Sequence, residues 1–426
     1  MHDAGIFRFN NTEIHMNKYL LSTLSSSLGL LILASCSDDK PTVTPVGEKL
    51  YAQNAGLQLF YSQAPMPGKF AKFTQNGSDA AIALGSQIDL SQISGLGLSG
   101  MLKAPGVLPG SPELLIQTKL LPDGDFYNFA GKGETDYVTY AYSGKVNKDS
   151  LIMAFDGVTL KNTRLANTAW TPAPLVKGNG LLEYKSMPFH IVWEYEPLPN
   201  VEIDLEKLLD IIVTAPVIPV YNNTAYSSLA QLLGSAVKSV GFRSDGNIAA
   251  TYLGTANGAA QFQQTPLNGF QYVVLSDNMM KLYLNPLSLY SLILTLQPAG
   301  SDNPDIDFTR ADTPATGFDM KRLLAAFIDA VGPMLAPGIP AEYTLSQSGL
   351  DIYMNTEMTV TLLNKTLLPL LQDDATVKAL LAYIQSQPDL APLLPKIQEA
   401  LPLIPKLFER TNRLELGFAC LPYPAK

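Results

Sequence analysis

The 426-residue sequence is poor in charge, in cysteine and in histidine, and each shortage excludes a class of protein. Charged residues make up 16% of the chain, against about 25% in a typical globular protein. Because disordered chains are rich in charge and poor in apolar residues, a chain that is 46% hydrophobic is predicted to fold. Two cysteines and three histidines are too few for a disulfide scaffold or a Cys/His zinc module. The formal net charge of −9 argues against nucleic acid as a partner, because nucleic acids bind basic surfaces.

The sequence also lacks the common catalytic motifs: a Gly-x-Ser-x-Gly elbow, a phosphate-binding loop and a Rossmann fingerprint. His190, at the start of an expected strand, favours a structural role over Ser-His-Asp catalysis. Glu194 and Glu196 are expected on one strand face, which is more typical of a solvated surface than of a glycosidase pair. Asp302–Asp307 resembles a calcium loop only loosely, since the sixth-position glycine and the terminal glutamate are missing. We therefore expect no enzymatic activity, no cofactor and no metal site.

The first 35 residues predict an export signal. Lys18 precedes the apolar run Tyr19–Ser35, which is the arrangement of a secretory signal and is shorter than a transmembrane helix. Leu33-Ala34-Ser35-Cys36 resembles the bacterial lipobox, in which the chain is cut before a cysteine that carries acyl chains such as palmitate. The resemblance implies lipidation of Cys36. Because each buried methylene adds about 0.8 kcal/mol of membrane affinity, several chains would anchor the protein stably.

The residues on either side of this signal refine its interpretation. Met16 is a more natural start than Met1, because Asp3 and Glu13 do not suit a positively charged leader. Behind Cys36, Ser37-Asp38-Asp39-Lys40 resembles the surface-export signal of Bacteroidetes lipoproteins, and the Pro/Thr-rich stretch up to Gly47 predicts a stiff tether. We expect an outer-membrane lipoprotein that is anchored through Cys36 and faces the cell exterior.

The remaining chain predicts an α+β fold with two parts: an antiparallel β domain, 50–200, that is barrel- or sandwich-like, and an α+β domain, 201–426. They follow a signal peptide, 1–35, and a lipidated tether, 36–49. The first part contains short β-prone runs between Gly, Pro and Asn turns, with Asp123-Gly124 as the strongest turn. These runs are Leu57–Tyr61, Ala80–Leu84, Leu114–Leu120, Tyr137–Tyr142, Leu151–Phe155 and Phe189–Tyr195.

The second part alternates between helical and strand periods. Helical spacing predicts helices over 205–212, 229–240 and 323–331, the second with Ser227 or Ser228 as its cap. Strands are expected at 248–253, 270–275, 281–284 and 350–363. The tail, 364–410, is expected to be helical and leucine-rich, with proline breaks.

Three stretches of the chain resemble one family. They are the turn-and-strand pattern from Pro122 to Trp170, the segment Asp245–Tyr252 and the tail Arg413–Gly417. They are similar to a family of Bacteroidetes surface lipoproteins, of unknown function, that pairs a lipocalin-like β unit with an α+β part. The resemblance implies this fold and carries no activity. Asn167-Thr168-Ala169-Trp170 departs from the Gly-Thr-Trp that the family more often shows.

Two functions remain open. Low charge, 12 methionines and leucine-rich helices favour a non-enzymatic binding module for an apolar or lipid-like molecule. The alternative is a glycan-binding accessory lipoprotein of a surface nutrient-capture system. The residues expected to contact a ligand are Trp170, Trp193 and Tyr195. Exposed rings at Trp193 and Tyr195 beside Glu194 would favour the glycan or a third hypothesis, a hydrolase built on carboxylates, and a dry cavity lined by Leu and Met would favour the apolar ligand.

Overall fold

The computed structural model describes residues 43–92, 99–179, 183–197, 204–214, 218–220, 225–256, 259–289, 320–371, 374–386, 388 and 391–423. Residues Val43–Lys426 form one compact unit. The predicted signal, Cys36, most of the tether and Asp302–Asp307 lie outside the described residues. Among the described helices, none is both long and apolar enough to span a membrane.

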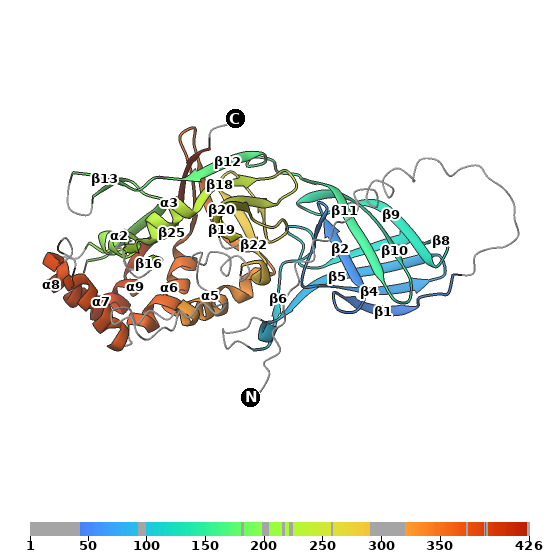
Figure 1. The fold of residues 1–426 in the computed structure, drawn as a ribbon, viewed down its shortest axis with the longest axis horizontal. Helices are drawn as coiled ribbons and strands as arrows, with labels where there is room; N and C mark the ends of the chain where they lie inside the picture. Colours follow the sequence, from blue (N-terminus) through green and yellow to red (C-terminus); the bar gives the residue numbers. More distant parts are fainter. Residues whose placement is uncertain are drawn as a thin grey trace, which may run out of the picture. The chain divides into compact units, whose positions relative to one another are not determined.

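The fold is α+β, and most of it consists of antiparallel sheets that include a half-barrel (Figure 1). Two sheets make up the first β region, Glu48–Leu160. One has the strand order β3-β2-β11-β10-β9-β8, and the other β1-β4-β5-β6 with β7 also paired to β5. The strands are β1 Glu48–Ala52, β2 Leu57–Tyr61, β3 Ala64–Pro65, β4 Lys69–Asn76, β5 Asp79–Asp89, β6 Met101–Lys103, β7 Leu114–Lys119, β8 Leu121–Asp123, β9 Phe126–Glu134, β10 Val138–Val146 and β11 Leu151–Leu160.

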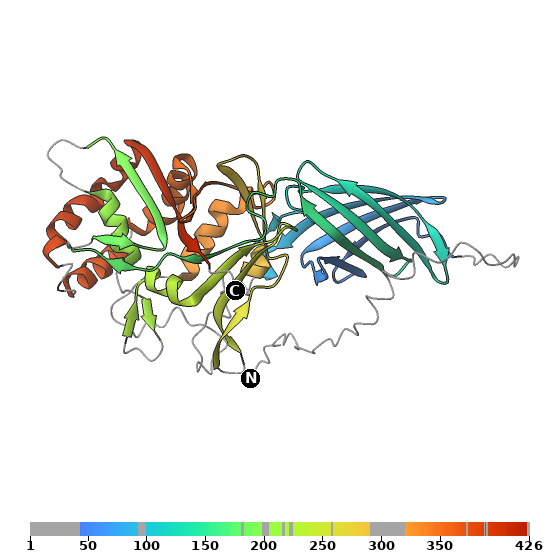
Figure 2. The ribbon, with the colours of Figure 1, turned by 90° about the horizontal axis from the view of Figure 1, so that it is seen from above.

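Side chains fill the space inside the first β region. Strand residues point alternately to the two faces of a sheet, so every second residue of β7 is buried, beginning at Leu114. The inward rows bring Tyr51, Phe73 and Phe155 together with aliphatic residues, and all three are fully buried. Figure 2 shows these long strands side by side. The predicted turn at Asp123-Gly124 is confirmed: Asp123 pairs with Phe126, and Gly124 has a φ of +57°.

A ten-stranded sheet forms the rest of the β structure, in the order β20-β19-β18-β12-β25-β24-β23-β22-β21 with β15 also paired to β25. Its strands are β12 Thr168–Pro172, β15 Phe189–Tyr195, β18 Val237–Phe242, β19 Ile248–Ala256, β20 Ala259–Gln264, β21 Phe270–Val274, β22 Met279–Leu284, β23 Ile339–Leu345, β24 Leu350–Met354 and β25 Thr411–Pro422. Two short ladders are β13 Val176–Lys177 with β14 Tyr184–Ser186, and β16 Ile218–Val220 with β17 Ala225–Ser227.

Helices pack on the apolar face of this sheet. Trp193 of β15 and Leu414 of β25 lie in one buried cluster with residues of the helical tail, including Leu407 and Phe408. The helices are α2 Leu205–Thr214, α3 Leu229–Ala236, α5 Met320–Leu335, α6 Thr356–Leu371, α7 Asp374–Ser386, α8 Leu394–Ala400 and α9 Ile404–Glu409. Prolines stand in the first turns of α8 and α9, where the missing N–H has no helical acceptor in any case.

Two element predictions are wrong in part. The expected helix 229–240 ends at Ala236, and Val237–Phe242 is strand β18, because its backbone pairs with β12 and β19. The expected strand 350–363 ends at Met354. Asn355 then starts α6, since its side chain accepts a hydrogen bond from the backbone N–H of Met358 at 3.1 Å.

The strand Phe189–Tyr195 forms as predicted, but its partner is β25 rather than a strand of the first β region. Strand β12 likewise pairs with β18 and β25. The ten-stranded sheet therefore includes two strands, β12 and β15, that come before residue 200.

Candidate functional site

The sheet forks at one residue of β25, and the fork creates a pocket. Strand β15 pairs with β25 as far as Phe418, and β12 pairs with it from Cys420 onward. Ala419 lies between the two partners: its N–H donates to Pro188 at 3.1 Å and its carbonyl accepts from the N–H of Ala173 at 2.9 Å. The chain between residues 173 and 188 leaves the sheet here as the β13–β14 hairpin.

The hollow beside the fork has a volume of about 410 Å³, which lies within the roughly 300–1,000 Å³ typical of ligand sites. We call it the fork pocket. Its lining residues are Ala173, Tyr184, Lys185, Ser186, Met187, Phe189, Thr344, Ser346, Ser348, Gly349, Asp351, Ala419, Cys420 and Leu421. They come from the fork, the β13–β14 hairpin and the turn between β23 and β24.

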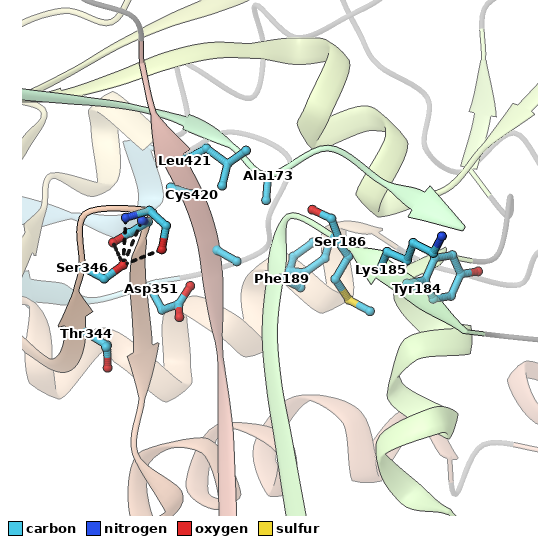
Figure 3. A pocket seen from close by; sticks show the side chains of 14 residues that line it. Ala173, Tyr184, Lys185, Ser186, Phe189, Thr344, Ser346, Asp351, Cys420 and Leu421 are labelled. Atoms are coloured by element: carbon cyan, nitrogen blue, oxygen red, sulfur yellow. Dashed lines mark hydrogen bonds between the residues drawn. The ribbon is translucent and has the colours of Figure 1, made fainter. Parts of the chain in front are cut away.

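Two groups of residues from different elements line this pocket (Figure 3). Thr344, Ser346 and Asp351 come from the β23–β24 hairpin, and Tyr184, Lys185 and Phe189 from the other side. The Oγ of Ser346 accepts from the N–H of Gly349 at 3.0 Å and holds the turn in place. The arrangement offers hydroxyl groups, one carboxylate, one ammonium group and two aromatic rings.

A polar network around the buried Glu415 lies next to Asp351 on the same face of the sheet. His190 Nε2 is 2.8 Å from Glu415 Oε2, and its Nδ1 is 3.8 Å from Asp351 Oδ2. Arg413 donates to both oxygens of Glu415, at 2.7 and 3.1 Å, and to Glu194 at 3.2 Å. These contacts give the buried Glu415 carboxylate two partners, as a buried charge requires.

Contacts within this network shift the pKa values of His190 and Glu415. Burial opposes the charged imidazole, but Asp351 and Glu415 outweigh it and raise the pKa of His190 above its ordinary value. Burial also opposes ionisation of Glu415, but hydrogen bonds from Arg413 and His190 lower its pKa below the ordinary value. Each of these two groups therefore favours the charged form of the other.

Gly417 gives His190 its position. This glycine pairs with His190 on one side and with Tyr353 on the other. Residues directly opposite each other in neighbouring strands point to the same face, so the two rings meet above the glycine. They stack with centroids 4.3 Å apart and planes at 15°. A side chain on Gly417 would meet the backbone of Ile352 and Tyr353.

Cys420 lies in the pocket wall without the features of a nucleophile. Burial, and secondarily the charge of Asp351, raises the pKa of its thiol to about 11. The thiolate is the reactive form of cysteine, and at neutral pH this group is almost entirely protonated.

The structure places the predicted ligand contacts apart from this pocket. Trp170 and Trp193 are buried, in different clusters, and their indole N–H groups donate to Thr168 and Thr411. Trp193 also stacks on Phe408, with centroids 5.4 Å apart. Tyr195 is half-buried against the same cluster. Neither tryptophan presents an open ring face to solvent, so the exposed ring at Trp193 that would favour a glycan is not found.

The acidic residues near Trp193 form ion pairs. Glu194 pairs with Arg413 and Glu196 with Arg410, each at 3.2 Å. Across the described part of the chain, no group of three or more His, Cys, Asp or Glu side chains is placed to hold a metal ion.

Sequence reasoning missed the fork pocket. A turn signal is present at Ser346-Gln347-Ser348-Gly349, but no local pattern connects it with residues 184–189. The link is strand β25, which pairs with β15 and β24 from distant parts of the chain. Comparisons of the chain with protein-family models, curated proteins and solved structures give no match.

Proposed function

We propose that the protein is a non-enzymatic binding protein of the bacterial cell envelope, and that its fork pocket takes a small polyhydroxylated ligand of the glycan type. The observation that carries this proposal is the lining of the pocket. The carboxylate of Asp351 and the hydroxyl groups of Thr344 and Ser346 line it from the β23–β24 hairpin, and the aromatic residues Tyr184 and Phe189 line it from β14 and β15. Sugars need this combination, because their hydroxyls bind carboxylates and their ring faces pack on aromatic side chains.

A lipid-like ligand is the second candidate function. Met187, Phe189 and Leu421 give the fork pocket an apolar edge, and Phe418 nearby is 51% exposed. The inside of the first β region offers less support for it. Tyr51, Phe73 and their neighbours fill that interior, whereas a lipid carrier needs an open one.

The wider setting of the proposal comes from the sequence. We propose that acyl chains on Cys36 anchor the protein in the outer membrane, and that the fork pocket faces the cell exterior. In this arrangement the first β region is a barrel-like, lipocalin-related unit, and the part that follows it is the α+β partner with its leucine-rich helical tail. Kinship with the Bacteroidetes surface lipoproteins belongs to the same proposal.

A binding role without catalysis fits the surroundings of Cys420, Glu415 and Asp351, the residues near the pocket that could react. The raised pKa of Cys420 keeps its thiol protonated, and Glu415 is held by Arg413 and His190. The accessible carboxylate of Asp351 lies 3.8 Å from His190. That separation suits charge stabilisation more than proton transfer, which needs hydrogen-bond range.

Native mass spectrometry of the gently purified chain, followed by titration with neutral oligosaccharides, tests the proposal. We expect saturable binding of at least one sugar and a loss of at least about tenfold in affinity for Asp351→Asn, because a charged hydrogen bond is removed. Asp125→Asn changes an exposed acid in the first β region and serves as the control. A co-purified lipid, with no sugar bound, would favour the apolar ligand instead.

A further inference from the structure

A second pocket lies between three turns that are distant in the sequence. They are the β9–β10 turn at Thr135–Tyr137, the β11–β12 loop at Lys161–Asn167 and the β21–β22 turn at Leu275–Asn278. The space has a volume of about 690 Å³ and shares no lining residue with the fork pocket. We call it the three-turn pocket.

Two cations of the middle loop line this pocket, in a protein whose net charge is −9. Lys161 pairs with Glu134 at 3.0 Å, and Arg164 pairs with Asp277. The side chains of Glu134 and Asp277 are 70% and 90% exposed. Because exposed ion pairs contribute little, a ligand carboxylate can replace either acid at small cost.

The loop that carries the cations is held in place from both sides. The N–H of Lys161 donates to the carbonyl of Tyr137 at 2.8 Å, and that of Asn167 to Phe242 at 2.6 Å. Between them the side chain of Asn162 accepts from the N–H of Arg164 at 3.2 Å, and Leu165 is fully buried. The backbone positions of Lys161 and Arg164 are therefore fixed before any ligand binds, which lowers the entropic cost of binding.

The other residues that line the three-turn pocket indicate what kind of anionic ligand it fits. Tyr137 and Leu275 supply an aromatic and an aliphatic surface, and Asn162 and Thr163 supply amide and hydroxyl groups. Asp136 also lines the pocket and would repel a bare anion, but it accepts hydrogen bonds from ligand hydroxyls. A ligand with one carboxylate, several hydroxyls and a compact ring satisfies all of these groups.

We propose that the three-turn pocket binds an acidic sugar of the uronate class, with its carboxylate on Arg164 and Lys161 and its hydroxyls toward Asp136 and Asn162. Arginine matches a carboxylate with two parallel hydrogen bonds, so Arg164 is the main anchor. This site is independent of the fork pocket, and neither proposal requires the other.

Calorimetric titration of the full chain with galacturonate at low ionic strength tests the inference. We expect saturable binding that weakens by at least about tenfold in Arg164→Gln and in Lys161→Gln, since each loses a charged hydrogen bond. Lys132→Gln, which changes an exposed lysine of β9 outside the pocket, should bind galacturonate as the unchanged protein does. Equal affinity in the unchanged protein and in Arg164→Gln would overturn the proposal, as would the absence of saturable binding.

Three further titrations separate this role from simple cross-linking of the turns and from unspecific anion binding. Asp277→Asn removes the partner that competes for Arg164, so galacturonate should bind more tightly, by about threefold or more. If the ion pair served only to tie the turns together, this variant would bind no better, and the proposal would fail.

Galactose, which lacks the carboxylate, should not bind here. Inorganic sulfate binding as tightly as galacturonate would also overturn recognition of the sugar.

Discussion

Lys69 and Glu415 are both buried charged side chains, yet their surroundings differ. Glu415 has Arg413 and His190 as charged partners. Lys69, on β4, has only neutral acceptors, the hydroxyl of Ser86 at 3.2 Å and the carbonyl of Pro105 at 2.5 Å. Burial therefore lowers the pKa of Lys69 to about 7, because no negative charge offsets the lost hydration. The two residues show that burial alone does not decide which form of a titratable group is present.

Lys69→Met should change the pH dependence of stability. The folded protein binds fewer protons at Lys69 than the unfolded chain between about pH 7 and the ordinary lysine pKa of 10.5. The unfolding free energy of the unchanged protein should therefore rise with pH across this window, by up to about 1.36 kcal/mol per pH unit relative to Lys69→Met. Urea unfolding at pH 7.5, 8.5 and 9.5 measures the difference.

Lys72→Met is the matched control, since Lys72 lies on the same strand with its side chain 58% exposed. Its unfolding free energy should follow that of the unchanged protein at every pH. Parallel curves for the unchanged protein and Lys69→Met would show that Lys69 keeps its proton when buried, and would contradict the prediction.

Strand β25 is the element that organises the candidate site. It carries Arg413, Glu415 and Gly417 on one face and pairs with β12, β15 and β24. A Cβ at position 417 would lie 2.0 Å from the carbonyl oxygen of Ile352, so β24 and β25 would have to separate. We expect Gly417→Ala to lower the unfolding free energy by about 1–3 kcal/mol through overpacking and to disturb the His190–Tyr353 stack. Urea unfolding and the NMR titration of His190 measure the two effects.

Gly241→Ala provides the comparison within the same sheet. A Cβ there would meet its nearest neighbours at 3.5 Å and 3.9 Å, which are ordinary contacts. Because glycine weakens a strand, this variant should be neutral or slightly stabilising. If Gly417→Ala were equally well tolerated, close approach of the strands at Gly417 would not determine the position of His190.

Local sequence signals predicted most of the described helices but only part of the strands, and they failed where pairing between strands decides. Strands β4, β9, β23 and β25 were not among the expected ones. β2 and β15 have the predicted bounds, and the cap of α3 at Ser228 is present. Val237 and Val240 continue the helical spacing of α3, and only pairing with β12 and β19 makes this segment a strand. Asparagine is a favoured N-cap residue, so Asn355 could have predicted the start of α6 and with it the end of β24.

The candidate site was less predictable than the elements. Residue type alone pointed to Trp170 and Trp193 as ligand contacts, but large aromatic side chains are more often buried than exposed, as both are here. The fork pocket depends on hydrogen bonds that Ala419 makes to residues more than 200 positions earlier. Nothing in the sequence around His190 indicates its contact with Glu415, which lies 225 residues further along the chain.

Across the whole molecule, one hydrophobic core joins the first β region to the ten-stranded sheet. It contains Tyr61 and Phe155 from the former and Tyr272, Tyr343 and Leu350 from the latter. A buried polar junction accompanies it. Ser62 donates to the carboxylate of Asp245 at 2.8 Å, and the side-chain amide of Asn268 donates to the carbonyls of Tyr61 and Ala64 at 3.0 and 3.1 Å. We therefore expect the two β regions to unfold together.

Asn268→Gly should weaken this coupling without straining the backbone. Asn268 has a φ of +67°, which glycine adopts readily, so the substitution removes the buried side chain and its hydrogen bonds without forcing the backbone to change. Leaving buried carbonyls without these donors should cost about 1–3 kcal/mol. Hydrogen exchange should accelerate in β2 and β3, which Asn268 holds, while exchange in α6 stays unchanged.

Asn167→Gly is the control for this experiment, because Asn167 also has a positive φ, +61°, but is exposed. It should leave exchange in β2 and β3 as it is in the unchanged protein. If Asn268→Gly behaved in the same way, the amide would not hold the β2–β3 turn, and the shared apolar core alone would couple the two β regions. If β2 and β3 already exchanged faster than β22 in the unchanged protein, the two regions would be opening separately, and the continuous core would not make them one cooperative unit.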